Sequence, residues 1–114
     1  MKAFLDSSAF AKRFIEESGS ARVETICAHA SALGLSVICV PEIVSALNRR
    51  LREHLLTQNQ YGDAKRRLLD DVRDADIIQL TPSVIGSAIR VLEAGSLRAM
   101  DALHIACALS LIHI

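Results

Sequence analysis

Three acidic residues occupy positions where a folded chain could bring them together. Asp6 follows the apolar stretch KAFL, Glu42 follows the apolar run LSVICV and a proline, and Asp101 lies near the start of the last amphipathic stretch. Such positions are typical of strand ends and helix beginnings, and in an open parallel sheet these ends share one edge, where sites usually form. The three acids are therefore candidates for a single site.

Carboxylates that converge repel one another, and a bound divalent cation is the simplest way to keep several of them ionised. Oxygen ligands with no His or Cys beside them favour Mg²⁺ or Mn²⁺ over zinc. Such an ion lowers the pKa of a bound water and neutralises charge on a phosphodiester. Asp6, Glu42 and Asp101 thus indicate a metal-dependent nuclease, in which they are both the metal-binding and the catalytic residues.

Each acid also has a purely structural interpretation. Asp6 could equally be the N-cap of the helix that follows it. Glu42, taken alone, is best explained as a first-turn acid that the helix dipole favours. Asp101 is harder to explain in this way, because small apolar residues surround it in AMDALHIACAL and a buried unpaired charge is costly.

Two other residue types accompany the acids. Ser7 and Ser8 follow Asp6 directly, where their hydroxyls could cap a helix or could hold a metal-bound water or the carboxylate itself. His104 could be a metal ligand, but a core or rim histidine is the favoured interpretation, because no second His lies at ligand spacing.

Basic residues gather in the segments NRRLREH and DAKRRLLDD, where phosphate contacts are conceivable. A solvated helix face is the favoured interpretation, particularly for the second segment, whose acids neutralise it. Neither a Walker A sequence nor G-x-G-x-x-G is present. The basic residues concerned are Arg49, Arg50, Arg52, Lys65, Arg66 and Arg67.

Apolar runs predict three strands, at 2–6, 35–40 and 76–80. The run at 35–40 is rich in β-branched residues, which is typical of a strand buried on both faces. Gly34 is expected to cap the preceding helix, and Pro41 to be the first residue of the next one.

Between the strands, apolar residues recur at helical spacing. Thr57 with Gln60 predicts a capping box, and Thr81 with Pro82 predicts an N-cap and first helical residue. Strands that alternate with helices indicate a parallel α/β sandwich. The expected helices cover 7–17, 21–33, 41–56, 61–75, 83–95 and 98–109.

Length and composition limit the possibilities further. The 114 residues suit one domain, and with 4% aromatic residues the core must be aliphatic. The net charge of +0 argues against a protein that coats nucleic acid through bulk charge. Three cysteines without a C-x-x-C pair suggest buried thiols in a reducing compartment. Because neither a signal peptide nor a membrane-spanning stretch is evident, we expect a cytoplasmic protein with no membrane association.

Three segments in order, FLDSSAFAKRF, VPEIVSALNRR and LRAMDALHIACAL, resemble the PIN domain, specifically the VapC-type toxins of toxin–antitoxin pairs. The resemblance spans nearly the whole chain and implies a three-layer α/β/α sandwich with a parallel sheet. It also implies an endoribonuclease that depends on Mg²⁺ or Mn²⁺ and hydrolyses RNA. Such a toxin is usually a homodimer and is held inactive by a VapB-like antitoxin.

Residue by residue, the resemblance makes Asp6 and Asp101 metal-binding acids and Glu42 the third acid of the site. Ser8 matches the serine that follows the first aspartate of the family. Two other classes of function compete with this assignment. One is a non-catalytic PIN-like module that binds RNA or protein, and the other is a phospho-acceptor domain, disfavoured because its acidic pair and lysine are not evident.

The end of the chain departs from the family pattern. A fourth acid is expected on a loop after a further strand, and this chain has neither. The final letters LSLIHI match a translation of CTG TCT CTT ATA CAC ATC, the start of a transposon-end adapter used in sequencing. We therefore interpret residues 1–108 as an incomplete PIN-like domain and residues 109–114, His113 included, as adapter-derived. Without its final strand, the segment 2–6 would have an unpaired edge, so poor stability and weak activity are expected.

Overall fold

The computed structural model describes residues 1–112; His113 and Ile114 lie outside the described part. Residues 1–112 form three strands, β1 (Lys2–Phe4), β2 (Ala32–Ser36) and β3 (Asp76–Ile78), together with six helices. The helices are α1 (Ser7–Ala11), α2 (Ser20–His29), α3 (Cys39–Arg52), α4 (Gln58–Asp74), α5 (Pro82–Ala94) and α6 (Ala99–Ile112).

The three strands form one parallel sheet in the order β1-β2-β3. Phe4 pairs with Gly34, and Leu35 pairs with Ile77. Within the described residues β1 pairs with β2 alone, so it is an edge strand. Because all strands run in one direction, the turn after β1 and the turn after β2 lie at the same edge of the sheet, as expected for a site built there.

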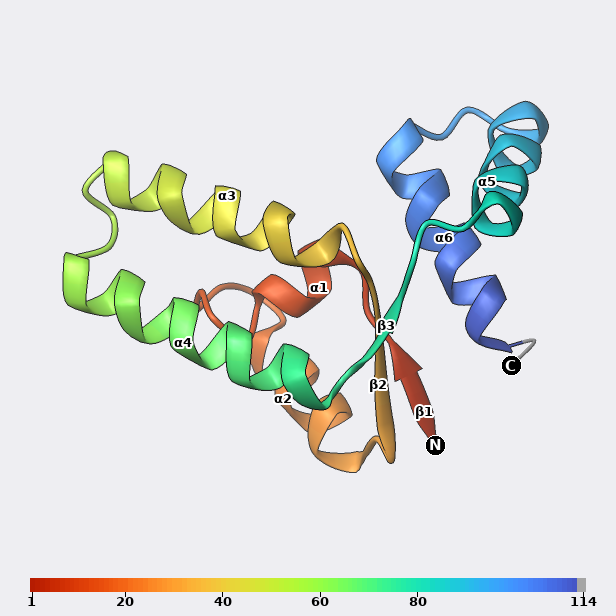
Figure 1. The fold of residues 1–114 in the computed structure, drawn as a ribbon. Helices are drawn as coiled ribbons and strands as arrows, with labels where there is room; N and C mark the ends of the chain where they lie inside the picture. Colours follow the sequence, from red (N-terminus) through yellow and green to blue (C-terminus); the bar gives the residue numbers. More distant parts are fainter. Residues whose placement is uncertain (113–114) are drawn as a thin grey trace.

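Helices cover both faces of this sheet (Figure 1). The helices α1 to α4 lie on one side, and α5 and α6 lie on the other, with α6 in contact with β2 and β3. The three-layer α/β/α sandwich is thereby confirmed. None of the helices in residues 1–112 has the length and apolar content needed to span a bilayer.

Two groups of buried side chains fill the layers, one on each side of the sheet. Leu5 and Ile77 pack in the first group, and their neighbours Phe4 and Ile78 pack in the second. Neighbouring residues separate in this way because successive side chains along a strand point to opposite faces of the sheet. The fully buried members are almost all aliphatic or small, apart from Phe10. The first group includes Phe10, Leu35, Cys39, Ile43, Leu47 and Leu68, and the second includes Ile78, Val84, Ala88, Ala102, Ala106 and Cys107.

The second strand was predicted three residues too late. It covers Ala32–Ser36, so Gly34 lies inside the strand and not at the end of a helix. A Cβ atom on Gly34 would lie 2.6 Å from Cδ2 of Leu111, so the glycine lets α6 approach the sheet closely. Pro41 is the third helical residue of α3, where a missing N–H leaves no helical hydrogen bond unmade.

The helix caps agree with the sequence. Thr57 and Gln60 form the predicted capping box of α4, with hydrogen bonds of 2.9 and 3.1 Å, and Thr81 caps α5 with Pro82 in its first turn. The helix predicted at 7–17 is shorter, because α1 ends at Ala11 and the chain continues in turns.

Candidate active site

Asp6 connects β1 to α1 and acts as the N-cap of that helix. Its Oδ1 accepts a hydrogen bond of 2.8 Å from the backbone N–H of Ala9. The other carboxylate oxygen makes no hydrogen bond to the described residues. The structural and the functional interpretations of Asp6 are therefore compatible, because capping uses one oxygen and leaves the other available to a ligand.

Asp101 lies in the first turn of α6, where the helix dipole favours a negative charge. Its side chain is exposed. The argument that its burial would demand a partner is therefore wrong: the small residues next to it, Ala102 and Ala106, face the core while Asp101 faces out. No ion pair joins Asp101 or Asp6 to a Lys or Arg within residues 1–112.

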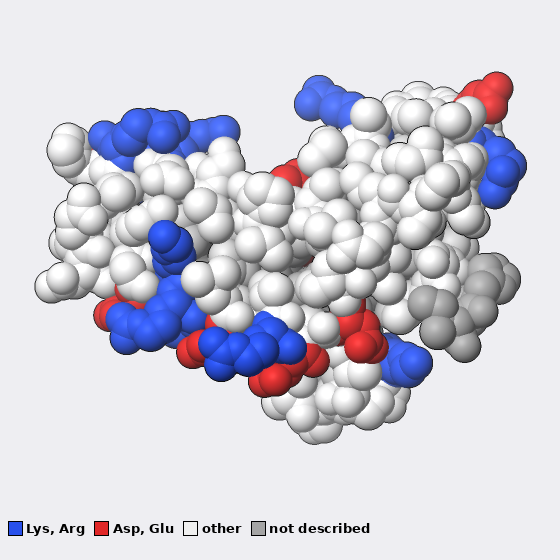
Figure 2. Space-filling view, viewed as in Figure 1, with Lys and Arg blue, Asp and Glu red and all other residues white. Residues whose placement is uncertain are grey.

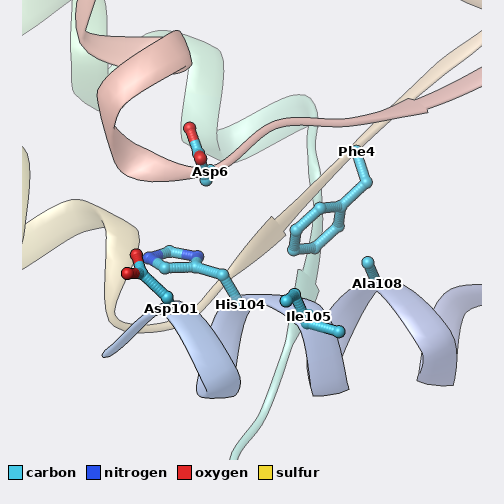
Figure 3. Close-up of a pocket in the computed structure, with 6 residues that line it drawn as sticks. All are labelled: Phe4, Asp6, Asp101, His104, Ile105 and Ala108. Carbon is cyan, nitrogen blue, oxygen red and sulfur yellow. The ribbon is translucent and has the colours of Figure 1, made fainter. Parts of the chain in front are cut away.

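Asp6 and Asp101 line the same pocket, which has a volume of about 360 Å³. In Figure 3 the side chain of Asp6 comes from the turn after β1, and those of Asp101 and His104 come from α6 on the other side of the pocket. No Lys or Arg is among the lining residues, so no cationic side chain of the described residues shares this pocket with the two carboxylates. The remaining lining residues are Phe4, Ile105 and Ala108.

Glu42 lies in the first turn of α3 and is not among the residues that line this pocket. Its Oε1 accepts a hydrogen bond from the hydroxyl of Ser7 and lies 2.8 Å from Nε2 of His104. His104 in turn lines the pocket that contains the two aspartates. The structure thus places Asp6 and Asp101 in one pocket and connects Glu42 to it only through His104; Glu42 itself lines a neighbouring groove, so the three predicted acids do not share a pocket among residues 1–112.

Ser7, His104 and Glu42 do not have the arrangement of a nucleophilic serine triad. In such a triad the base contacts serine through one ring nitrogen and the acid through the other. Here Ser7 and Glu42 both contact Nε2 of His104, at 3.1 and 2.8 Å, and the Ser7 hydroxyl donates to the carboxylate. A serine hydrolase is therefore not supported.

Ser8 occupies a different place from its neighbour. It is exposed and lines a separate pocket between α1 and α3, with Lys12 and Arg50. The assignment of Ser8 to the site therefore has no contact to support it among the described residues, and Ser7 is the serine that touches Glu42. Sequence alone left the two equivalent, because adjacent hydroxyls in a short helix point in different directions.

The chemistry of the donor set bears on the expected metal. Within residues 1–112, no group of three or more His, Cys, Asp or Glu side chains is close enough to hold an ion by itself. Mg²⁺, however, usually keeps several waters and uses one or two carboxylates together with substrate phosphates. Asp6 and Asp101, exposed and without a cationic neighbour in their pocket, fit that mode of binding.

Cys39 lies beneath the site, fully buried next to Ser7. Burial raises the pKa of its thiol to about 11; a hydrogen bond with Ser7 opposes this rise, and the carboxylates of Glu42 and Asp6 add to it. The thiol is therefore neutral near pH 7. A neutral thiol is a poor metal ligand, which agrees with a site made of oxygen donors.

The surface around the site is hollowed. Figure 2 shows a hollow between the part formed by α3 and α4 and the part formed by α5 and α6, with acidic atoms visible in it. Basic side chains gather on the outer side of α3, which carries Arg49, Arg50 and Arg52 in its last turn. Arg49 lines a groove that also contains Glu42 and Met100, so a positive charge lies in the same groove as Glu42.

The fold and the pocket together identify the class of this protein: it is an α/β protein with a parallel three-layer sandwich and a candidate metal site at the carboxyl edge of the sheet. The PIN domain family model matches residues 3–111. The chain therefore belongs to the PIN domain family.

Two curated relatives share 33% identity with this chain over 107 residues, which is 94% of this chain and 74% of each relative. They are ribonuclease VapC45 from Mycobacterium tuberculosis (strain CDC 1551 / Oshkosh) and ribonuclease VapC49 from Mycobacterium tuberculosis (strain ATCC 25618 / H37Rv). Among solved structures, Mycobacterium tuberculosis VapC20, described as a sarcin-ricin loop cleaving toxin, matches with a TM-score of 0.67 and 17% identity. That match covers 93% of this chain and 79% of VapC20.

Proposed function

We propose that this protein is an endoribonuclease, the toxin of a VapBC-type toxin–antitoxin pair, and that it hydrolyses RNA phosphodiester bonds with Mg²⁺ or Mn²⁺. The observation that carries the proposal is that Asp6 and Asp101 line one pocket with no Lys or Arg among its lining residues. Membership of the PIN family and 33% identity to proteins named VapC ribonucleases support the same activity.

Asp6 and Asp101 would hold the ion, with Glu42 as the third acid beside them. A divalent cation at this position would act as a Lewis acid on the phosphodiester and on the attacking water. Arg49, in the groove that contains Glu42, would bind a neighbouring phosphate of the RNA. The site would thus orient the RNA backbone across the carboxyl edge of the sheet.

The test is cleavage of RNA by Asp6→Asn and Asp101→Asn variants. Each substitution removes a charge and preserves shape, and Asn caps a helix as well as Asp does, so the fold should be kept. We expect each variant to lose more than roughly 100-fold in Mn²⁺ affinity and in cleavage rate. Replacing a residue that only hydrogen-bonds to a metal ligand already lowers affinity or activity about 10–100-fold. Asp76→Asn, an exposed aspartate at the start of β3, is the matched control. Cleavage at the wild-type rate by either site variant would disprove the assignment.

A second candidate function is a non-catalytic PIN-like module that binds RNA or protein. The observation that favours it is that residues 1–112 contain no preformed group of three or more metal ligands. This alternative requires that calorimetry detect no Mn²⁺ binding and that EDTA leave RNA binding unchanged. Saturable Mn²⁺ binding that Asp101→Asn removes would exclude it.

The proposed partners are a VapB-like antitoxin and a second copy of this chain, and the proposed location is the cytoplasm. Large apolar side chains are exposed on α5 and α6, among them Ile85, Ile89, Met100 and Ile105. An exposed apolar surface of this kind is typical of a surface that a partner covers. A small antitoxin gene next to the coding sequence, and co-purification of its product, would support the pairing.

A further inference from the structure

His104 is a buried polar residue on an otherwise apolar helix face. It is 7% exposed and lies between Ala102 and Ala106 on α6, both of which are buried in the core. Its Nε2 lies 2.8 Å from Oε1 of Glu42 and 3.1 Å from the hydroxyl oxygen of Ser7. The ring therefore joins three elements, α1, α3 and α6, at the edge of the sheet where the candidate site lies.

The protons in this cluster can be assigned from its chemistry. A carboxylate oxygen only accepts hydrogen bonds, so Nε2 of His104 and the Ser7 hydroxyl are both donors to Oε1 of Glu42. Two donors on one oxygen fix the position and the plane of the carboxylate. The second oxygen, Oε2, makes no hydrogen bond to any residue in the described range and stays available to a ligand.

The other ring nitrogen of His104 shows that packing does not explain the residue. Its Nδ1 is buried and has no hydrogen-bond partner within residues 1–112. An unsatisfied buried polar atom costs free energy, so an apolar side chain would suit this core position better. Glu42, whose side chain is 31% exposed, would reach water without the histidine. The contact that distinguishes His104 from an apolar residue at this position is therefore its hydrogen bond to the carboxylate of Glu42.

We propose that His104, assisted by Ser7, is a positioning residue: by holding Oε1 of Glu42 it keeps Oε2 free to take part in binding the divalent cation in the neighbouring pocket of Asp6 and Asp101. This inference rests on the proposed function, because it needs a cation at Asp6 and Asp101. Carboxylates that bind metals are commonly oriented by hydrogen bonds from a second set of residues, whose loss lowers metal affinity or activity about 10–100-fold.

The experiment measures Mn²⁺ affinity by calorimetry and Tm without metal for His104→Leu, His104→Gln and the wild type. Leucine is apolar and has no donor, so we expect Mn²⁺ to bind at least about 10-fold more weakly while Tm does not fall. The Gln side-chain N–H can replace the Nε2–H donor, so His104→Gln should bind Mn²⁺ within about threefold of the wild type. His54→Gln, in the turn that follows α3, is the matched control.

The outcomes separate this inference from the proposed function. If His104→Leu binds Mn²⁺ as tightly as the wild type while Asp6→Asn does not bind it, the positioning role is wrong and the metal site stands. If the wild type itself binds no Mn²⁺, both are wrong. Should His104→Leu fail to fold, Ser7→Ala decides: a drop of about threefold or more in Mn²⁺ affinity supports the positioning role, and wild-type affinity overturns it.

Discussion

At the scale of single residues, Cys39 shows how strongly burial raises the pKa of a side chain beneath the candidate site. The side chain is fully buried, and its pKa is about 11 against an ordinary value of 9.0. The native state therefore keeps its proton at pH values where the unfolded chain has lost it. Because the unfolded state then binds fewer protons, stability falls as pH rises through this range.

We expect the free energy of unfolding of the wild type to decrease between pH 9 and about 11, and to be insensitive to this thiol below pH 9. Urea unfolding followed by circular dichroism at several pH values measures the effect. Cys39→Ala should lose part of the dependence, and Cys27 and Cys107, whose pKa values burial also raises, account for a further part. An unchanged pH profile in Cys39→Ala would contradict the assignment.

At the scale of elements, two glycines have opposite roles. Gly34 lies in β2, where a Cβ would be 2.6 Å from Leu111 on α6 and 3.3 Å from Phe4 on β1. Gly62 lies within α4, where a Cβ would meet nothing within 4 Å. The first glycine serves packing between α6 and the sheet, and the second only weakens its helix.

We therefore expect Gly34→Val to destabilise the protein by about 1–3 kcal/mol, the usual cost of overpacking. Gly62→Ala should stabilise it by about 0.5–1 kcal/mol, because alanine has the higher helix propensity. Thermal unfolding of the two variants beside the wild type measures both values. Combining Gly34→Val with Leu111→Ala should recover part of the loss; equal stability of Gly34→Val and the wild type would show that α6 does not approach β2 closely.

At the scale of the whole molecule, the positively charged side chains are not spread evenly over the surface. The net charge is +0, so RNA cannot be held by a general positive field. Instead the basic side chains of α3 gather on one outer surface, and Arg49 lies in the groove that contains Glu42. RNA affinity should therefore depend on a few phosphate contacts close to the site.

We expect Arg49→Gln combined with Arg52→Gln to weaken RNA binding and to reduce the slope of log K against log salt by about 1 for each arginine that binds a phosphate. Mn²⁺ affinity should stay unchanged, because neither arginine lines the pocket of Asp6 and Asp101. Filter binding at several salt concentrations measures the slope. Arg73→Gln, which removes an exposed arginine from α4, is the control, and an equal effect there would show that binding is non-specific.

The unpaired edge of strand β1 in the described part of the chain also affects the behaviour of the whole molecule. Within residues 1–112 it pairs with β2 alone, and an unpaired edge promotes association with other chains. The expectation of low stability and weak activity, and the interpretation of residues 109–114 as adapter-derived, stay predictions. In the structure α6 continues through Ile112, and Leu111 packs against the second core group.

The sequence by itself determined the local features of this protein. The capping box at Thr57 and Gln60, the cap at Thr81, and the order of strands and helices all depend on residues a few positions apart, so pattern alone revealed them. The three acids were likewise predicted from their places at element ends, and two of them, Asp6 and Asp101, line one pocket.

Tertiary structure decided the rest, because it depends on residues far apart in the chain. It selected Ser7 over Ser8 as the partner of Glu42, and it brought Nε2 of His104 within 2.8 Å of Glu42, a contact that the apolar sequence around the histidine does not predict. It also placed Gly34 inside a strand, since only the approach of α6 requires a glycine there. Contacts between α1, α3 and α6 are set by packing of the whole fold, which no local pattern encodes.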